Sequence, residues 1–338
     1  MPDLAARARR RNLVLSAGFL VGNMLVAQGQ TPTPPDTALQ VKLIRTIQPK
    51  SLRLSDRDRL SGGLPQKVPF RMATDSQGRI LITEPYLSLI QVFDIEGGKR
   101  WQLKGENIQR MVFPTYIAVD GDDRIYVSEP MLASVLVFFP DGRFARSIGG
   151  SELSLPFGLA VDKAAQCLYV VDHQRGAIQV YSLEGKFLKS IGTYGSAAGE
   201  LNHPTEITFQ NDVLYVLDAG NARFQEFDLE GHSRAVFPFG DDRLPLAFAV
   251  DTAGKLYCVD GISLGLVVLD PAGNLVSAFG VRRGYGQPSA ADRYPTYTSV
   301  TARRDGVILA LRPDLAVDVL ELETAVAPAT SPEKPDKE

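Results

Sequence analysis

Residue types that commonly bind metals or act in catalysis are scarce in this sequence. Its 338 residues include three histidines and two cysteines. His173, His203 and Glu206 could together ligate a metal such as zinc, because a catalytic zinc site typically takes three protein ligands. His232 is expected at a turn on the opposite face, so it would not add a third imidazole. Packing is the alternative role for His203.

The cysteines exclude further kinds of site. Two cysteines cannot build a disulfide scaffold, a multi-cysteine zinc site or an iron–sulfur cluster. Cys167 and Cys258 fall in repeats that are not neighbours, and we expect both to be free buried thiols. No phosphate-binding loop or Cys–His nucleophile pair is apparent. We therefore assign no catalytic residue and expect no cofactor, with calcium or zinc as the alternative.

Composition narrows the class of protein. Hydrophobic residues make up 44% of the chain and charged residues 22%, which predicts a packed core and excludes global disorder. The net charge of -3 and the acidic pI argue against a nucleic-acid binder, which needs basic residues to neutralise phosphates. Abundant glycine and proline without a fixed period favour a turn-rich β protein.

The N-terminal segment has the features of an export signal. Four arginines precede an apolar run from Leu13 to Ala27, and small residues then fit a signal-peptidase site. We predict a signal peptide at 1–29 and a Pro/Thr-rich tether at 30–40. The run is too short to span a bilayer comfortably, so no stable membrane insertion is expected after cleavage. An uncleaved anchor and a twin-arginine signal remain alternatives.

Internal repeats organise the rest of the chain. Six segments begin with a proline and continue into a short apolar stretch, at intervals of 41 to 50 residues, which are typical of propeller blades. The repeat prolines are Pro69, Pro114, Pro156, Pro204, Pro245 and Pro295. Each is followed by further strand-like stretches rich in β-branched and aromatic residues, separated by tight-turn signals. The pattern predicts an all-β fold made of four-stranded blades.

The sixth repeat lacks its fourth strand, and the missing piece is found at the other end of the chain. VKLIRTI at 41–47 resembles the fourth strand KFLKSIG of the third repeat. We predict a six-bladed β-propeller at 41–323 that this N-terminal strand closes by completing blade six, so that no sheet edge is left exposed. A disordered tail is expected at 324–338.

The fourth repeat also carries a family resemblance. GTYGSAAGELNHPTEITF (192–209) followed by VLYVLDAGNARFQEFDLEG (213–231) resembles an NHL repeat, and the surrounding blades resemble weaker copies. The resemblance implies a six-bladed propeller but leaves the activity open, since NHL propellers include sensor domains, scaffolds, RNA binders and an amidating lyase. That lyase gathers several histidines around its axis, and a lactonase-like calcium site needs several carboxylates there. Glu206 is the one candidate here that fits the lactonase-like pattern.

Comparing the six repeats with one another selects candidate ligand-binding residues. The position two residues after each proline is expected at the mouth of the axial channel, and it varies sharply between the repeats. The position two residues further on is uniformly small, which predicts a narrow waist. Surface variation without a ligand is the alternative. The mouth candidates are Arg71, Tyr116, Glu206 and Tyr297.

Two further groups lie near this face. Acidic residues end five of the second strands, and we expect them to cap turns rather than to form a metal ring. Arg312 replaces them in the sixth repeat; it could pair with neighbouring carboxylates, and it is a further ligand-binding candidate at the mouth. The loop at 280–294 could form a lid with Arg282, Arg283 and Tyr285, or it could be a solvated insertion.

Together these features favour an exported binding module. We expect a non-enzymatic, periplasmic or extracellular NHL-type propeller that binds a protein, peptide or glycan at its axial mouth and does not bind nucleic acid. The alternative is a metal-dependent hydrolase or lyase, lactonase-like or amidating-lyase-like, which would use His203, Glu206 and His173.

Overall fold

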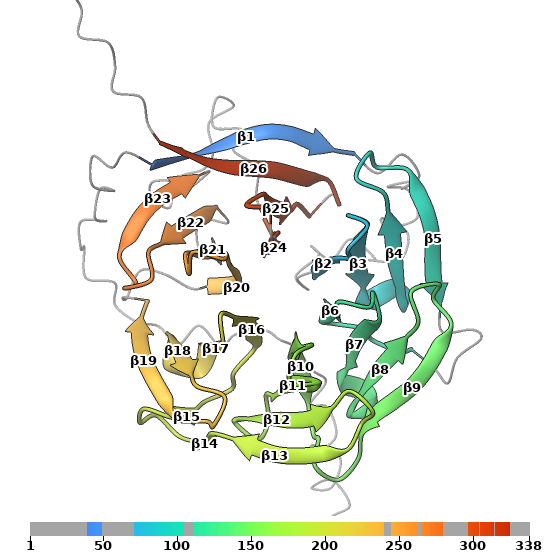
Figure 1. Ribbon diagram of the computed structural model, residues 1–338, viewed down its shortest axis with the longest axis vertical. Coiled ribbons are helices and arrows are strands. Elements are labelled where there is room, and N and C mark those ends of the chain that lie inside the picture. Colours follow the sequence, from blue (N-terminus) through green and yellow to red (C-terminus); the bar gives the residue numbers. More distant parts are fainter. Residues whose placement is uncertain are drawn as a thin grey trace, which may run out of the picture. The chain divides into compact units, whose positions relative to one another are not determined.

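Six four-stranded antiparallel sheets form the fold, arranged as the blades of a ring (Figure 1). The computed structural model describes residues 39–48, 71–104, 111–239, 245–261, 265–279, 297–303, 305–313 and 315–324. All of them belong to one compact unit. The predicted signal peptide lies outside these residues, as do nearly all of the predicted tether and tail. Within the described residues, no helix has the length and apolar character needed to cross a bilayer.

The first three blades follow the repeats in chain order, and each blade runs from its innermost to its outermost strand. Blade 1 contains β2 (Met72–Thr74), β3 (Ile80–Glu84), β4 (Leu89–Phe93) and β5 (Lys99–Lys104). Blade 2 contains β6 (Ile117–Val119), β7 (Ile125–Glu129), β8 (Ser134–Phe138) and β9 (Phe144–Gly149). Blade 3 contains β10 (Pro156–Asp162), β11 (Cys167–Asp172), β12 (Ala177–Ser182) and β13 (Phe187–Ile191).

The remaining blades continue this order, and the last one takes a strand from the other end of the chain. Blade 4 contains β16 (Glu206–Gln210), β17 (Val213–Asp218), β18 (Arg223–Phe227) and β19 (Ser233–Pro238). Blade 5 contains β20 (Pro245–Val250), β21 (Leu256–Asp260), β22 (Leu266–Leu269) and β23 (Leu275–Phe279). Blade 6 contains β24 (Ser299–Ala302), β25 (Ile308–Leu311), β26 (Val317–Thr324) and β1 (Leu39–Ile47).

The predicted closure of the ring is confirmed. Strand β1 pairs antiparallel with β26 and begins two residues before the predicted strand at 41–47. Thr46 Oγ1 donates a hydrogen bond to Asp318 Oδ1 at 2.7 Å across this pair. The innermost strands β2, β6, β10, β16, β20 and β24 each contact the next, and β24 contacts β2. The fold is therefore a closed six-bladed propeller.

Hydrophobic packing lies between the blades. Each of six buried clusters combines side chains from two neighbouring blades, because both faces of every sheet are covered by the adjacent sheets. Ile90 of blade 1 and Phe138 of blade 2, for example, share one cluster and are fully buried. Cys258 is buried in blade 5 as expected, whereas Cys167 in blade 3 is only half-buried, and neither cysteine forms a disulfide.

Candidate functional site

Three of the predicted mouth residues meet at the axis of the propeller. Arg71 precedes β2, Tyr116 precedes β6 and Glu206 begins β16, so each side chain enters from an innermost strand of a different blade. Arg71 Nε lies 3.3 Å from Glu206 Oε1, and Arg71 Nη2 donates to the Tyr116 hydroxyl at 3.0 Å. The guanidinium carbon lies 4.5 Å from the centre of the Tyr116 ring. We call these three residues the axial cluster.

The Arg71 guanidinium also reaches the opposite blades. Its Nη2 donates to the Leu246 carbonyl at 2.7 Å, and its Nη1 donates to the Thr298 carbonyl at 3.3 Å. These acceptors lie in or beside the innermost strands of blades 5 and 6. One side chain from blade 1 therefore contacts blades 2, 4, 5 and 6.

The axial cluster is an internal ion pair. The Arg71 and Glu206 side chains are 5% and 11% exposed, and the Nε–H of Arg71 does not align well enough with the carboxylate for a hydrogen bond. Glu206 Oε2 accepts from the Phe248 amide at 3.1 Å. Burial raises the pKa of Glu206, and the Arg71 charge opposes that rise. Burial also raises the pKa of Tyr116 to about 12, which keeps its phenol protonated at neutral pH.

The fourth mouth candidate does not join this cluster. Tyr297 is fully buried, and its hydroxyl donates to Asp318 Oδ2 at 2.9 Å inside blade 6. Arg312 Nη1 lies 3.9 Å from Asp318 Oδ1, so the expected pairing of Arg312 with a carboxylate is confirmed. Tyr297 and Arg312 thus share one carboxylate within their own blade. The lid candidates Arg282, Arg283 and Tyr285 lie outside the described residues.

A row of rings leads from the axial cluster to the exposed surface of blade 3. Tyr116 stacks on Phe157 at a centroid distance of 5.7 Å, and Phe157 stacks on His173 at 4.5 Å. His173 lies 5.0 Å from His203, whose ring contacts Tyr194 at 5.8 Å. Tyr194 is 59% exposed. We call these five residues the mouth row.

Sequence comparison of the repeats does not identify Phe157 or Tyr194. Phe157 directly follows a repeat proline, one position before the residue that varies sharply between the repeats. Tyr194 lies in the 193–203 spacer, whose length matches the NHL repeat and therefore carries little information. The sequence carried no signal that joins either residue to the histidines.

The two histidines of the mouth row are each held by a hydrogen bond. A carbonyl oxygen can only accept, so His173 Nδ1 donates to the Pro204 carbonyl at 3.0 Å. His203 Nδ1 donates to Asn202 Oδ1 at 2.6 Å. Burial lowers the pKa of His173, which favours its uncharged form at neutral pH.

Glu206 does not join the histidines as a third metal ligand. One of its oxygens pairs with Arg71 and the other accepts from a backbone amide. Across the part of the chain that the structure describes, no three His, Cys, Asp or Glu side chains gather as a metal site would require.

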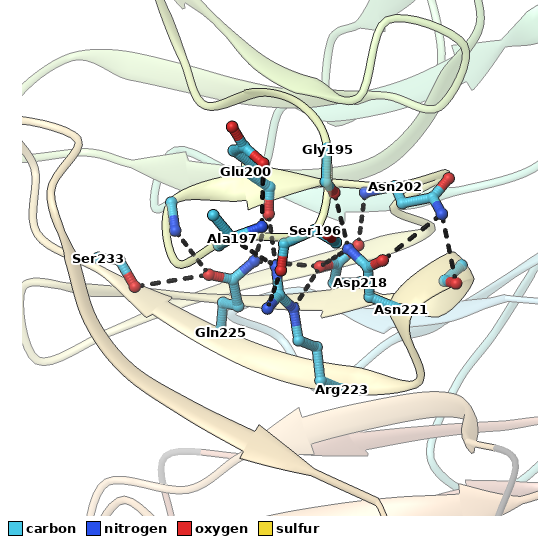
Figure 2. A network of polar contacts seen from close by, with 12 residues as sticks. Gly195, Ser196, Ala197, Glu200, Asn202, Asp218, Asn221, Arg223, Gln225 and Ser233 are labelled. Carbon is cyan, nitrogen blue, oxygen red and sulfur yellow. Dashed lines mark hydrogen bonds and ion pairs between the residues drawn. The ribbon is translucent and has the colours of Figure 1, made fainter.

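A network of polar side chains in blade 4 positions the spacer that carries Tyr194 and His203 (Figure 2). The spacer contains the short parallel pair β14 (Thr193–Tyr194) and β15 (Glu200–Leu201). Arg223 reaches it with three hydrogen bonds, to the carbonyls of Ser196 at 2.8 Å, Ala197 at 2.7 Å and Glu200 at 2.8 Å. The spacer is therefore fixed to β18 along its length.

Asp218 stands at the centre of this network. Its carboxylate accepts from Asn202 N at 2.7 Å, Asn221 Nδ2 at 2.8 Å, Arg223 Nε at 2.7 Å and Gln225 Nε2 at 3.0 Å. The Asn202 contact is next to His203, whose φ of 46° is in the left-handed region that few non-glycine residues adopt. We call Asp218, Asn221, Arg223 and Gln225 the spacer clamp.

The other acidic strand ends also cap backbone amides. Glu129 accepts from Val112 N and Phe113 N at 2.9 Å each. Asp172 accepts from Ser154 N at 2.8 Å and Leu155 N at 3.2 Å. The expectation that these carboxylates serve structural capping is confirmed for blades 2, 3 and 4.

Gly158 occupies the mouth position of blade 3 because the innermost strands approach closely there. A Cβ at Gly158 would lie 2.6 Å from Glu206 Cα and 2.7 Å from Ile207 N. Gly158→Ala is therefore expected to lower the free energy of unfolding by about 1–3 kcal/mol, measured by urea denaturation. Gly121→Ala is the control, since the three atoms nearest to its Cβ all belong to the flexible Lys163 side chain. Equal free energies of unfolding for the two variants would contradict the claim that the close approach of the strands requires glycine at position 158.

Comparisons with known proteins agree with this architecture. A family described as a six-bladed β-propeller (DUF5128) matches residues 159–249. The human E3 ubiquitin-protein ligase NHLRC1 is 29% identical over 122 residues, which are 33% of this chain and 31% of the ligase. The match thus spans about a third of the length of that curated relative.

Solved structures share the fold at low sequence identity. A streptogramin B lyase superposes with a TM-score of 0.56 at 13% identity, covering 77% of this chain and 95% of the lyase. A catalytically inactive variant of virginiamycin B lyase from Staphylococcus aureus gives 0.57 at 11% identity, covering 76% and 97%. A chain of a nidogen/laminin complex gives 0.56 at 21% identity, covering 64% and 83%.

Fold, axial cluster and comparisons together define the class: this chain is a six-bladed β-propeller in which the Arg71 side chain crosses the axis. Its blades are consistent with the NHL type.

Proposed function

We propose that this propeller is an exported, non-enzymatic binding module that takes a protein, peptide or glycan ligand at its axial mouth. The mouth row carries the proposal, because it presents aromatic and imidazole groups from the axis to the exposed Tyr194. Aromatic rings supply large contact areas and stack on both peptide and sugar groups. Export is inferred from the N-terminal arginines and apolar run alone.

The axial cluster supports binding over catalysis. Arg71, Tyr116 and Glu206 pair with one another and with backbone groups of blades 5 and 6, so the only carboxylate among the mouth candidates is engaged in an ion pair. The lyases that share the fold do so at 11–13% identity, which carries over no activity. Hydrolase or lyase activity is therefore the result that would contradict the proposal.

Binding to peptide and glycan arrays tests the proposal. Tyr194→Ala is expected to weaken binding of any selected probe by about tenfold or more, because tyrosine is enriched among interface hot spots, whose loss costs about 2 kcal/mol or more. Tyr86→Ala is the matched control, since Tyr86 is 61% exposed but lies outside the mouth row. Equal loss in both variants, no loss in either, or metal-dependent turnover of a captured probe would contradict the proposal.

A further inference from the structure

The two imidazoles of the mouth row form a close pair, in addition to their place on the surface that the proposed function uses. The His173 and His203 ring centroids lie 5.0 Å apart with the planes inclined at 59°. The third histidine of the chain, His232, lies in the exposed turn between β18 and β19 and pairs with Asp228 at 3.0 Å. Two of three histidines thus meet at one place although they lie 30 residues apart in the sequence.

The hydrogen bonds of the pair leave the same ring nitrogen available on both residues. Each Nδ1 donates its proton to an oxygen, Pro204 O for His173 and Asn202 Oδ1 for His203. A neutral imidazole carries one N–H, so each Nε2 keeps a lone pair. Among the described residues, no hydrogen bond reaches either Nε2.

This arrangement matches the way histidines are oriented around metals. Metal-binding histidines usually donate the second ring N–H to a carbonyl or carboxylate, which fixes the tautomer and the ring. With metal–nitrogen distances of about 2.0–2.1 Å, two imidazoles on one ion place their centroids roughly 4.5–5 Å apart. The observed 5.0 Å agrees with that separation.

Both rings are held before any ion arrives. His173 stacks on Phe157, and its hydrogen bond ties it to the segment that carries His203. The spacer clamp fixes the neighbouring Asn202 through Asp218 at 2.7 Å. Binding would therefore order few additional groups, and preorganisation favours affinity.

We propose that His173 and His203 bind one borderline divalent transition-metal ion through their Nε2 atoms, Cu²⁺ most tightly. Imidazole favours such ions, and affinity for nitrogen ligands rises along the series to Cu²⁺. Two protein ligands leave the other positions to water, because the described residues offer no third metal-binding side chain there. The site is thus open and lies on the exposed part of the mouth row.

Titration of the full chain, without a histidine tag, with Cu²⁺ by calorimetry and electron paramagnetic resonance tests the site. One ion per chain with two equatorial nitrogen ligands is expected. His203→Gln and His173→Gln are each expected to weaken Cu²⁺ binding by about tenfold or more. His232→Gln is the matched control and is expected to leave affinity and spectrum unchanged.

The outcomes separate a built site from adventitious binding. Equal weakening in all three variants, or an unchanged spectrum in His203→Gln, would overturn the proposal. His203 is exposed, so its replacement leaves the core intact and decides the question if His173→Gln does not fold. The test uses Cu²⁺ alone, so a failure of the peptide and glycan arrays does not affect it.

Discussion

Arg71→Met is expected to lower the free energy of unfolding by about 3–5 kcal/mol, because it leaves the Glu206 carboxylate buried without its counter-charge. Both side chains are nearly inaccessible to water, so the lost attraction is not replaced by solvation. The variant also removes the donors to the carbonyls of Leu246 and Thr298. Urea denaturation followed by tryptophan fluorescence and circular dichroism measures the loss.

Two controls identify the cause of that loss. Arg45→Met breaks an exposed ion pair with Glu96 and is expected to cost less than about 1 kcal/mol. The double variant Arg71→Met/Glu206→Gln removes both charges and is expected to recover part of the stability, since an uncharged pair avoids the isolated buried carboxylate. A double variant less stable than Arg71→Met would contradict this explanation.

The Arg71→Met variant should also respond differently to pH. Burial already raises the pKa of Glu206, and removing the Arg71 charge removes the influence that opposes this rise. A carboxyl whose pKa is raised on folding stabilises the native state at low pH and loses that contribution as pH rises through the folded pKa. Relative to wild type, the variant should therefore regain stability as pH falls towards the ordinary glutamate value of 4.5.

The fold could be predicted because each blade is encoded locally. A proline, a short apolar stretch and three further strands recur at blade spacing, and each tight turn lies within its own repeat. Closure could be predicted because the segment at 41–47 resembles the fourth strand of another blade, and it pairs with β26 as expected. Neither inference required knowledge of side-chain conformations.

The axial cluster could be predicted only in part. Equivalent positions in the repeats place Arg71, Tyr116 and Glu206 on one face, but the repeat pattern does not show that Arg71 is long enough to cross the axis. The same pattern placed Tyr297 with them, whereas its hydroxyl bonds Asp318. Asp318 lies on the third strand of blade 6, at the register position that Gln225 holds in blade 4. A carboxylate at this buried position was the sequence signal that the Tyr297 hydroxyl bonds within its own blade.

The mouth row could not be predicted, because it depends on contacts between elements. Stacking of Phe157 on His173 joins the first and second strands of blade 3. The approach of His203 depends on the path of the spacer, which the clamp in blade 4 determines. Repeat comparison detects residues at equivalent positions and gives no information on such neighbours.

Asp218→Ala is expected to lower the free energy of unfolding by about 3–5 kcal/mol, because it leaves Arg223 and three other donors without their common buried acceptor. The Asp218 side chain is fully buried, and Arg223 beside it is 11% exposed. Asp270→Ala is the control, since Asp270 caps an exposed turn in blade 5 through Ala272 N and Asn274 N. That variant is expected to lose about 0.5–1.5 kcal/mol, measured by the same urea denaturation.

The same variant should disturb the mouth row at a distance from the mutated residue. Without Asp218, the Asn202 amide loses its acceptor and Arg223 is no longer oriented towards Ser196 and Ala197. Hydrogen exchange of the 193–203 spacer is therefore expected to increase more than exchange in blades 1 and 6, because the spacer is held chiefly by this network. An equal increase in exchange in all blades would show that Asp218 supports only the global stability of the ring. An increase in exchange that is confined to the spacer would show that the clamp holds His203 beside His173.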